Sequence, residues 1–275
     1  MGLLKVNLDA CDRDGICVAV CPIGILALDA ERGPYVRDRS AQFCLACGHC
    51  VAVCPKGALD NVRSPFSSHE TLPPESIVEP GTAYHFLRSR RSIRCYEPKP
   101  VPKDMLLRLL DIARYAPSGH NSQGISYLVV EGRGPLESVC GFVLEWMRKT
   151  IEEQPEAANQ WHMPGIVKAW ERGDDRILRK APHLVVAYAS KDLRPALIST
   201  CLALEYVELY APTLGLGTCW AGFTQICAQQ YPKLPEYLGI PQDKAVTGML
   251  MVGYPKVRYH RAPPRNPLDV KWLSS

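Results

Sequence analysis

Three features that would point to a membrane, to a dinucleotide or to nucleic acid are missing from this sequence. No apolar run approaches the roughly 20 residues of a membrane helix, because Gly, Pro or charged residues interrupt every candidate. No Gly-x-Gly-x-x-Gly follows a predicted strand. The net charge is only +4, and the positive charge is spread out except for one cluster at residues 88–94. We expect neither a membrane nor a nucleic acid partner.

The N-terminus also lacks the apolar core and cleavage site of a secretory signal, so we expect a cytoplasmic protein. With 275 residues, 47% hydrophobic and 22% charged, the chain is long enough for one or two folded domains. Its 12 cysteines are unevenly placed, since seven precede residue 55. Without an export signal, this pattern does not favour disulfides. The later five are scattered and suit small buried hydrophobic positions: Cys95, Cys140, Cys201, Cys219 and Cys227.

The early cysteines form an internal repeat. CDRDGICVAVCPIG, which starts at Cys11, returns as CLACGHCVAVCPKG, which starts at Cys44. Two halves that each end in Cys-Pro resemble the bacterial ferredoxin domain, in which C-x2-C-x2-C-x3-C-P occurs twice. The resemblance covers about residues 1–63 and implies two iron–sulfur clusters. In that family three cysteines of one run bind one cluster and the fourth serves the other.

This resemblance implies two ligand sets. The first consists of Cys44, Cys47, Cys50 and Cys21, and the second of Cys11, Cys17 and Cys54 with Asp14 at the position of the missing cysteine. Carboxylate binds iron more weakly than thiolate, so the second cluster is expected to be [4Fe-4S] with a labile iron or [3Fe-4S]. Zinc is the alternative, but a duplicated frame of seven cysteines suits it poorly. His49 is expected to be a neighbour of the first cluster that tunes its potential.

Residues 64–80 concentrate Ser, Pro and Glu and contain Pro73-Pro74, which predicts a domain boundary. We therefore expect an iron–sulfur domain over 1–63, a linker of limited swing over 64–80, and a second domain over 81–275. In the second domain, helices are predicted over 83–89, after Pro102 and from 193 to about 214, and strands over 126–130, 183–189 and 245–252. The predicted fold class is α+β.

Four blocks of the second domain carry its chemistry. Arg90, Arg91, Ser92 and Arg94 in RSRRSIRCYEP suit a phosphate group. ARYAPSGHNSQG, GLGTCWAG and GYPKVRYHRAPPRNPLDV follow in that order. Together they resemble the nitroreductase family of FMN flavoproteins over residues 81–275. The family's usual Pro-Trp after its Asn turn is absent here, because Gly124 and Ile125 follow Gln123.

The resemblance implies the FMN-binding residues and a homodimer with flavin at the subunit interface. The Arg block would hold the phosphate and ribityl chain, and a C-terminal arginine would return to the phosphate, either Arg265 or its rival Arg261. The implied residues nearer the flavin ring are Pro117, Ser118, Gly119, Asn121, Trp220, Ala221 and Gly222.

Because FMN would supply the chemistry, no protein nucleophile or general base is expected. Residues 152–173 are expected either to cover the flavin and select the substrate, or simply to pack a pair of helices together. In both cases the side chains involved are those of Trp161, His162, Met163 and Trp170. His162 is a candidate proton donor. We expect electrons from a ferredoxin or other low-potential donor, with NAD(P)H as the alternative, to reduce a small nitro, quinone or activated-alkene substrate. The alternative functions are an electron-transfer module of a larger complex, and specialised dehalogenation or flavin-modifying chemistry.

Overall fold

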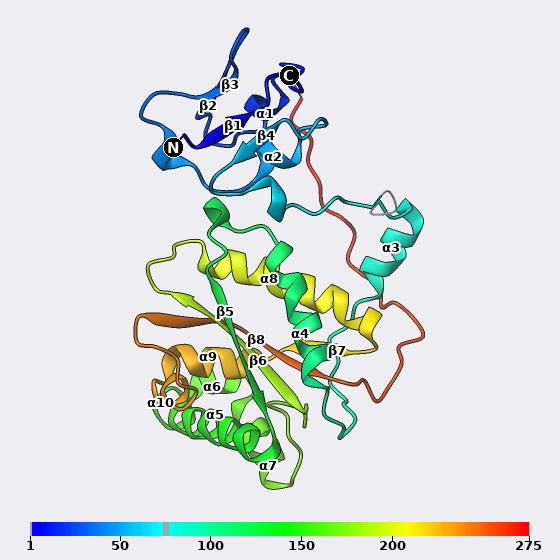
Figure 1. The fold of residues 1–275 in the computed structure, drawn as a ribbon. Helices are drawn as coiled ribbons and strands as arrows, with labels where there is room; N and C mark the ends of the chain where they lie inside the picture. The colour runs from blue at the N-terminus through cyan, green and yellow to red at the C-terminus, as the bar shows by residue number, and fades with distance from the viewer. Residues whose placement is uncertain (1, 74–76, 275) are drawn as a thin grey trace. The chain divides into compact units, whose positions relative to one another are not determined.

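The computed structural model describes residues 2–73 and 77–274, and these form two compact units (Figure 1). The first unit contains the described residues up to Val78 together with His120–Ser122, and the second contains the described residues of Glu79–Gly119 and those from Gln123 onward. Residues 74–76, which include the second proline of the predicted Pro73-Pro74 pair, lie outside the described part. Among the described residues, no helix is both long and apolar enough to cross a membrane.

The first unit consists of two small antiparallel sheets and two short helices. Strand β1 pairs with β4, and β2 pairs with β3. Its elements are β1 (Leu4–Val6), α1 (Ile16–Ala19), β2 (Leu26–Asp29), β3 (Gly33–Val36), a 3-10 turn (Ala41–Phe43), α2 (His49–Ala52), β4 (Leu59–Asn61) and a 3-10 turn (Phe66–Ser68).

The backbone of this unit repeats as the sequence does. Gly15 and Gly48 precede α1 and α2 with φ of 75° and 73°, a left-handed conformation that glycine adopts at little cost. At Gly48 a Cβ atom would also lie 2.6 Å from the Ser64 hydroxyl oxygen. Each glycine is followed two residues later by a buried cysteine, Cys17 or Cys50. The repeated motif therefore sets two cysteine sulfurs at equivalent places.

The second unit is built on one antiparallel sheet of order β5-β6-β8-β7. Its elements are α3 (Pro80–Ser89), α4 (Lys103–Asp111), a 3-10 turn (Ile112–Tyr115), β5 (Ile125–Glu131), α5 (Arg133–Glu153), α6 (Pro155–Gln160), α7 (Met163–Glu171), β6 (His183–Ser190), α8 (Ala196–Tyr210), a 3-10 turn (Ala211–Leu214), β7 (Gly217–Trp220), α9 (Gly222–Gln230), α10 (Lys233–Tyr237) and β8 (Lys244–Gly253). Another 3-10 turn, Gly119–Asn121, spans the boundary of the two contact units.

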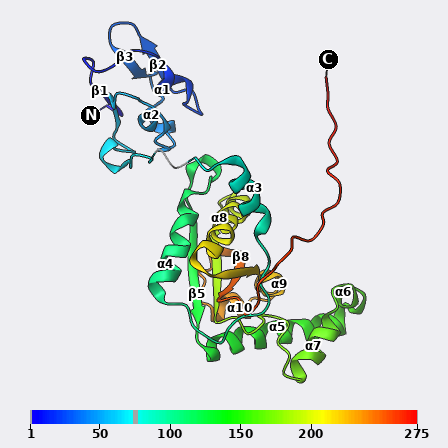
Figure 2. The same ribbon diagram turned by 90° about the vertical axis from the view of Figure 1, so that its right-hand side faces the viewer.

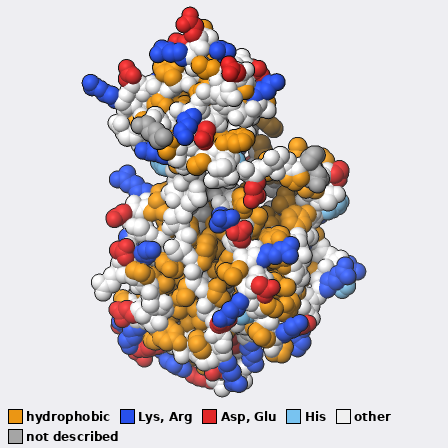
Figure 3. Space-filling model, viewed as in Figure 1, with side chains coloured by type: hydrophobic (Ala, Val, Ile, Leu, Met, Phe, Trp, Pro, Cys, Tyr) orange, Lys and Arg blue, Asp and Glu red, His pale blue; other side chains and the backbone are white. Residues whose placement is uncertain are grey.

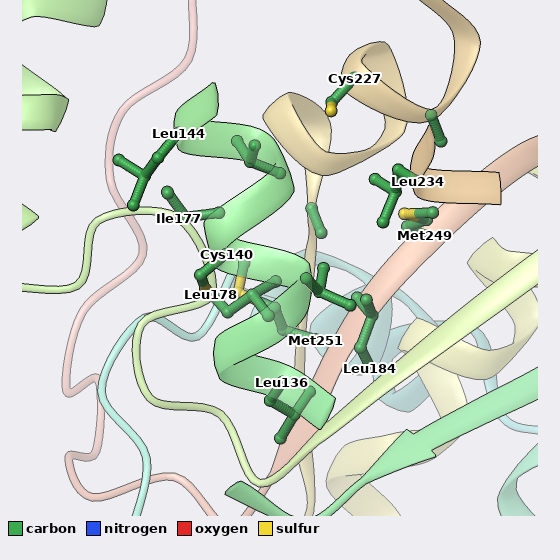
Figure 4. Packing of buried hydrophobic residues seen from close by; sticks show 14 of the residues in the cluster. Leu136, Cys140, Leu144, Ile177, Leu178, Leu184, Cys227, Leu234, Met249 and Met251 are labelled. Carbon is green, nitrogen blue, oxygen red and sulfur yellow. The ribbon is translucent and has the colours of Figure 1, made fainter. Parts of the chain in front are cut away.

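Helices cover both faces of this sheet, with α4 and α8 on one side and α5 on the other (Figures 1 and 2). Successive side chains of a strand point to opposite faces. Accordingly, Leu184 and Val186 of β6 join the core that α5 and α9 complete, whereas Val185 and Ala187 join the core with α4 and α8. Figure 4 shows the first of these cores, where Leu136 and other α5 residues lie near β8. The central strands are consequently apolar on both faces.

The α+β fold class predicted from the sequence is confirmed. The three predicted strands fall within β5, β6 and β8, and the predicted helix from Leu193 becomes α8 followed by a 3-10 turn that ends at Leu214, directly before Gly215. Helix α3 begins earlier than predicted, at Pro80, because the Glu79 carboxylate accepts hydrogen bonds from the N–H groups of Gly81 and Thr82. The long helix α5 and strand β7 were not among the predicted elements.

Candidate functional site

Two hollows in the first unit gather the predicted cluster ligands. One is lined by Cys21, Cys44, Cys47 and Cys50 together with Asn61, and it measures about 380 Å³ including the part open to solvent. His49 also lines this hollow, as a cluster neighbour would. We refer to it as the first hollow.

The second hollow, of about 360 Å³ on the same measure, is lined by Cys11, Asp14, Cys17 and Cys54, and by a further carboxylate, Asp12. Asp14 is exposed, and its Oδ1 accepts a hydrogen bond of 3.0 Å from the Ile16 N–H at the start of α1. Each hollow thus brings together one of the two ligand sets that the resemblance implies.

The chemistry of both hollows fits iron–sulfur clusters. Thiolate is the ligand that such clusters require, and N–H groups near the sulfurs stabilise its charge. Burial raises the pKa of Cys17 and Cys50, so metal binding must displace their protons. The Ala58 N–H donates to Cys54 Sγ at 3.3 Å, and Asn61 Nδ2 donates to two sulfurs of the first hollow, those of Cys44 and Cys50. Within the described residues, no three His, Cys, Asp or Glu side chains are placed to hold a single metal ion.

In the second unit, α8 anchors the predicted phosphate-binding block. The guanidinium of Arg90 lies 3.7 Å from carboxylate oxygens of both Glu205 and Glu208. Glu208 is buried, which raises its pKa, and its Oε1 also accepts a hydrogen bond of 3.1 Å from the Thr218 hydroxyl. This network joins the residue that follows α3 to α8 and β7.

The rest of the block runs beside β7. The Ile93 N–H donates to the Thr218 carbonyl at 2.8 Å, and burial raises the pKa of the Cys219 thiol in β7. A Cβ at Gly217 would lie 2.5 Å from Ile93, so only glycine allows this approach. The block from Arg90 to Arg94 and the GLGTCWAG block, distant in sequence, are therefore neighbours.

Arg91 and Arg94 complete the basic group. Arg91 Nη1 donates to the Arg88 carbonyl at 2.8 Å, while its buried Nε has no hydrogen-bond partner among the described residues. Arg94 is exposed and its Nη1 donates to the Ser92 carbonyl at 3.4 Å. A buried N–H donor beside exposed guanidinium groups fits an anion such as a phosphate. In contrast, both C-terminal arginines are exposed, and Arg265 Nη1 donates to the adjacent Pro264 carbonyl.

The polar turn after Pro117 is held by two hydroxyl groups. Ser118 Oγ accepts the Gln123 N–H at 3.0 Å, and the Gly119 N–H donates to Ser199 Oγ of α8 at 3.3 Å. At Gly119 a Cβ would lie 2.6 Å from the Pro195 ring, so the turn requires glycine.

Asn121 belongs to the first unit by its contacts. Its Nδ2 donates to the carbonyls of Leu45 and Ala46 at 3.2 and 3.1 Å. The φ of Asn121 is 52°, a left-handed conformation that asparagine tolerates better than most residues.

Trp220, Ala221 and Gly222 form the junction of β7 and α9. Trp220 Nε1 donates to Gln225 Oε1 at 2.6 Å, and the Ala221 N–H donates to the Met249 carbonyl at 2.8 Å. These bonds fix the indole and the backbone at the start of α9.

Residues 152–173, the segment predicted to cover the flavin, contain both buried and exposed large side chains. Met163 is buried and Trp170 packs against the same core, as expected for a helix pair. Trp161 and His162 are exposed, and the Trp161 ring lies edge-on to Phe223, with centroids 6.2 Å apart. Because Phe223 follows Gly222, this contact places Trp161 beside the start of α9.

Three residues that position the site were absent from the sequence prediction: Asn61, Ser199 and Glu208. Only Glu208 had a signal, since it is one of two acidic residues, with Glu205, in a helix that is mostly apolar. Asn61 lies outside the cysteine runs and has no motif of its own.

Two family models match this chain. Residues 87–254 match the model of the nitroreductase family. The chain belongs to the nitroreductase family. Residues 10–59 match the model of a 4Fe-4S dicluster domain, so both resemblances drawn from the motifs are confirmed, and the chain is an oxidoreductase of this family with an iron–sulfur domain.

Curated family relatives cover most of the second unit. An iodotyrosine deiodinase from Thermotoga neapolitana is 25% identical over 195 residues, which are 69% of this chain and 96% of the relative. A putative NADH dehydrogenase/NAD(P)H nitroreductase from Archaeoglobus fulgidus is 27% identical over 176 residues, 61% of this chain and 82% of the relative.

Solved structures support the fold. A nitroreductase with bound FMN from Desulfitobacterium hafniense aligns with a TM-score of 0.57 at 20% identity, covering 72% of this chain and all (100%) of that one. An iodotyrosine deiodinase bound to FMN and 3-iodo-L-tyrosine aligns with a TM-score of 0.51 at 22% identity, covering 70% and 98%.

Proposed function

We propose that this chain is an FMN-dependent oxidoreductase in which two iron–sulfur clusters of the N-terminal domain relay electrons for the two-electron reduction of a small organic substrate with a nitro, quinone or activated-alkene group. The observation that carries this proposal is the gathering of two thiol sets in two separate hollows of a chain whose other domain is a nitroreductase domain. The domain limits stay as predicted, 1–63 and 81–275 with a linker between them.

The proposed ligand sets follow the two hollows. Cys21, Cys44, Cys47 and Cys50 would hold a [4Fe-4S] cluster, and Cys11, Cys17 and Cys54 with Asp14 would hold a [4Fe-4S] or [3Fe-4S] cluster. FMN, when bound, exchanges one or two electrons, whereas each cluster exchanges one, so the pair can link one-electron donors to two-electron reduction.

The protein's own residues bind and orient the flavin in this proposal. Arg90, Arg91, Ser92 and Arg94 would bind the phosphate, with the unpaired Arg91 Nε as one donor. Arg90 can bind the phosphate only if its guanidinium breaks its ion pairs with Glu205 and Glu208 of α8, or contacts the phosphate and these carboxylates at the same time. The Pro117–Asn121 turn and the Trp220–Gly222 junction would contact the ring, and Trp161 beside Phe223 would exclude water. Arg261 and Arg265 remain the two candidates for a further phosphate contact.

A homodimer is part of the proposal, and α8 supports it. This helix exposes large apolar side chains, with Leu197 53%, Ile198 68% and Leu202 40% accessible. Hydrophobic side chains also gather on the face of the second unit that Figure 3 shows. Such surfaces on a folded domain favour association. The cytoplasmic location stays a prediction from the sequence.

Reductive dehalogenation is a second candidate function. It is favoured by the similarity to the iodotyrosine deiodinase of Thermotoga neapolitana, which extends over 96% of that relative. Release of halide from a halogenated phenol, measured with purified protein and a reductant, would support this function over nitro or quinone reduction.

Anaerobic stopped-flow spectroscopy tests the main proposal. Reduced ferredoxin, NADH and NADPH are mixed separately with the protein, and absorbance follows the clusters and the flavin. Ferredoxin should reduce the clusters before the flavin. Flavin bleaching by NADH or NADPH with no change at the clusters would contradict the proposed relay.

Asp14→Cys tests the second ligand set. The variant should bind about eight irons per chain, because all four ligands would then be thiolates as in a two-cluster ferredoxin. Wild-type protein, purified anaerobically, should lose one iron per chain on mild oxidation and gain the EPR signal of a three-iron cluster. Asp12→Cys is the matched control, since Asp12 lines the same hollow outside the cysteine frame. Equal resistance of the wild type and Asp14→Cys to iron loss would exclude a special role for Asp14.

A further inference from the structure

Asn61 is the last residue of β4, and its side chain is buried, with only 3% exposed. A buried amide must satisfy one acceptor and two N–H donors. Its Oδ1 accepts the Arg63 N–H at 2.9 Å. This bond fixes which end of the amide faces the backbone, and it directs Nδ2 to the opposite side.

Both donors of Nδ2 are directed at sulfur. Nδ2 lies 3.7 Å from Cys44 Sγ and 3.8 Å from Cys50 Sγ. These two thiols line the first hollow with Cys21 and Cys47, and Asn61 lines it as well. One side chain therefore donates to two of the four proposed ligands of a single cluster.

The repeat supplies an internal comparison. Cys44 stands 33 positions after Cys11, so the counterpart of Asn61 in the first half is Leu28. Leu28 has no N–H in its side chain and is 41% exposed. The backbone N–H groups that follow the two buried cysteines are used alike in both halves, since those of Val18 and Val51 donate to the Gly15 and Gly48 carbonyls at 3.0 and 2.9 Å. The Asn61 amide thus places a side-chain donor at a position where the first half has the apolar Leu28.

We propose that Asn61 sets the reduction potential of the cluster held by Cys44 and Cys50, by donating hydrogen bonds to both sulfurs. This inference rests on the proposed ligand sets. Reduction adds one electron to the cluster, and the extra negative charge spreads onto the thiolates. N–H donors stabilise that charge more in the reduced state than in the oxidised state, so they raise the potential. No bond to iron forms or breaks in this step.

The test is an EPR-monitored redox titration of the full chain, with iron analysis of every preparation. In Asn61→Leu the midpoint of one couple should move to a more negative potential. Loss of neutral hydrogen bonds should change the ratio of reduced to oxidised cluster about fivefold at fixed potential, or roughly 40 mV at 59 mV per tenfold change. The redox couple whose midpoint potential shifts in Asn61→Leu should be the couple whose midpoint potential is unchanged in Asp14→Cys.

Asn61→Asp separates tuning from structure. The carboxylate can still accept the Arg63 N–H, but it has no donor for the sulfurs and adds negative charge. A purely structural role predicts that this variant restores the wild-type midpoint, whereas tuning predicts a midpoint more negative than that of Asn61→Leu. Asn7→Leu is the matched control, because Asn7 is an exposed asparagine of the same unit and its Oδ1 accepts only a local bond from Asp9.

Two results would overturn the inference. If both couples are present in Asn61→Leu and Asn61→Asp at wild-type potentials, Asn61 does not tune the cluster, although the proposed ligand sets stand. If wild-type protein reconstituted with iron and sulfide binds no cluster at Cys44 and Cys50, the ligand sets fail and the inference fails with them.

Discussion

Replacing His183 with glutamine should remove an acid-induced loss of stability from the second unit. His183 begins β6 and is 1% exposed, and its Nε2 accepts a hydrogen bond of 2.8 Å from the Val101 N–H. The neutral ring therefore carries its proton on Nδ1, and a second proton would have to enter at Nε2 and break that bond. Burial lowers the pKa of His183, in agreement with this geometry.

The direction of the pH effect follows from proton linkage. A histidine in the unfolded chain has a pKa of about 6.5, and that of folded His183 is lower. Below about pH 6.5 the unfolded state therefore binds a proton that the folded state excludes. The free energy of unfolding falls in this range by at most about 1.36 kcal/mol per pH unit, until the folded pKa is reached. Between about pH 7.5 and 5.5 the loss is at most about 1.4 kcal/mol.

Urea unfolding at about pH 7.5, 6.5 and 5.5 measures this loss. All five tryptophans follow residue 145, so tryptophan fluorescence reports on the second unit. In His183→Gln the amide oxygen can still accept the Val101 N–H but does not titrate, so the pH dependence should weaken by up to about 1.4 kcal/mol. His85→Gln, at an exposed position, should leave it unchanged. Equal pH dependence in wild type and His183→Gln would refute the reasoning.

Two further substitutions test the geometry of the second unit. Gly217→Ala should lower the free energy of unfolding by about 1–3 kcal/mol in urea titrations, because the new Cβ would lie 2.5 Å from Ile93. Gly141→Ala is the control in helix α5, where the new Cβ would meet no side chain within 4 Å. This variant should raise the free energy of unfolding by up to about 1 kcal/mol. Equal free energies of unfolding for Gly217→Ala and the wild type would refute the claim that the approach to Ile93 requires glycine. Arg90→Ala should weaken FMN binding at least about tenfold in fluorescence titrations, since a charge-assisted bond to phosphate contributes about 1.5–3 kcal/mol. Arg133→Ala, which removes a surface ion pair with Glu137, should leave FMN binding unchanged. If the wild type, Arg90→Ala and Arg133→Ala bind FMN with equal affinity, Arg90 does not bind the FMN phosphate.

Local signals explain what the sequence could predict. The strands β6 and β8 are apolar runs because helices cover both faces of the sheet, and a run of that kind is visible without knowledge of its neighbours. Gly215 ends the α8 region with φ of 70°, as glycine after a helix often does. The cysteine repeat was equally visible, because the two runs share VAVCP and resemble the two halves of a bacterial ferredoxin domain.

Contacts between distant segments could not be predicted in this way. The pair of Arg90 and Glu208 and the bond from Gly119 to Ser199 join residues about 80 or more positions apart, and no periodicity encodes them. Strand β7 was missed for a related reason. It has only four residues, and its place beside Ile93 depends on the tight approach at Gly217.

The duplicated backbone of the first unit has a practical consequence. Gly15 and Gly48 hold nearly the same conformation, so the chain context is shared between halves while the side chains differ at Asp14 against Cys47 and at Leu28 against Asn61. Each half can therefore serve as the reference state for the other within one molecule. A residue copied across at an offset of 33 changes one of the two cysteine sets, while the corresponding set of the other half, in the same sample and at the same pH, serves as the internal control.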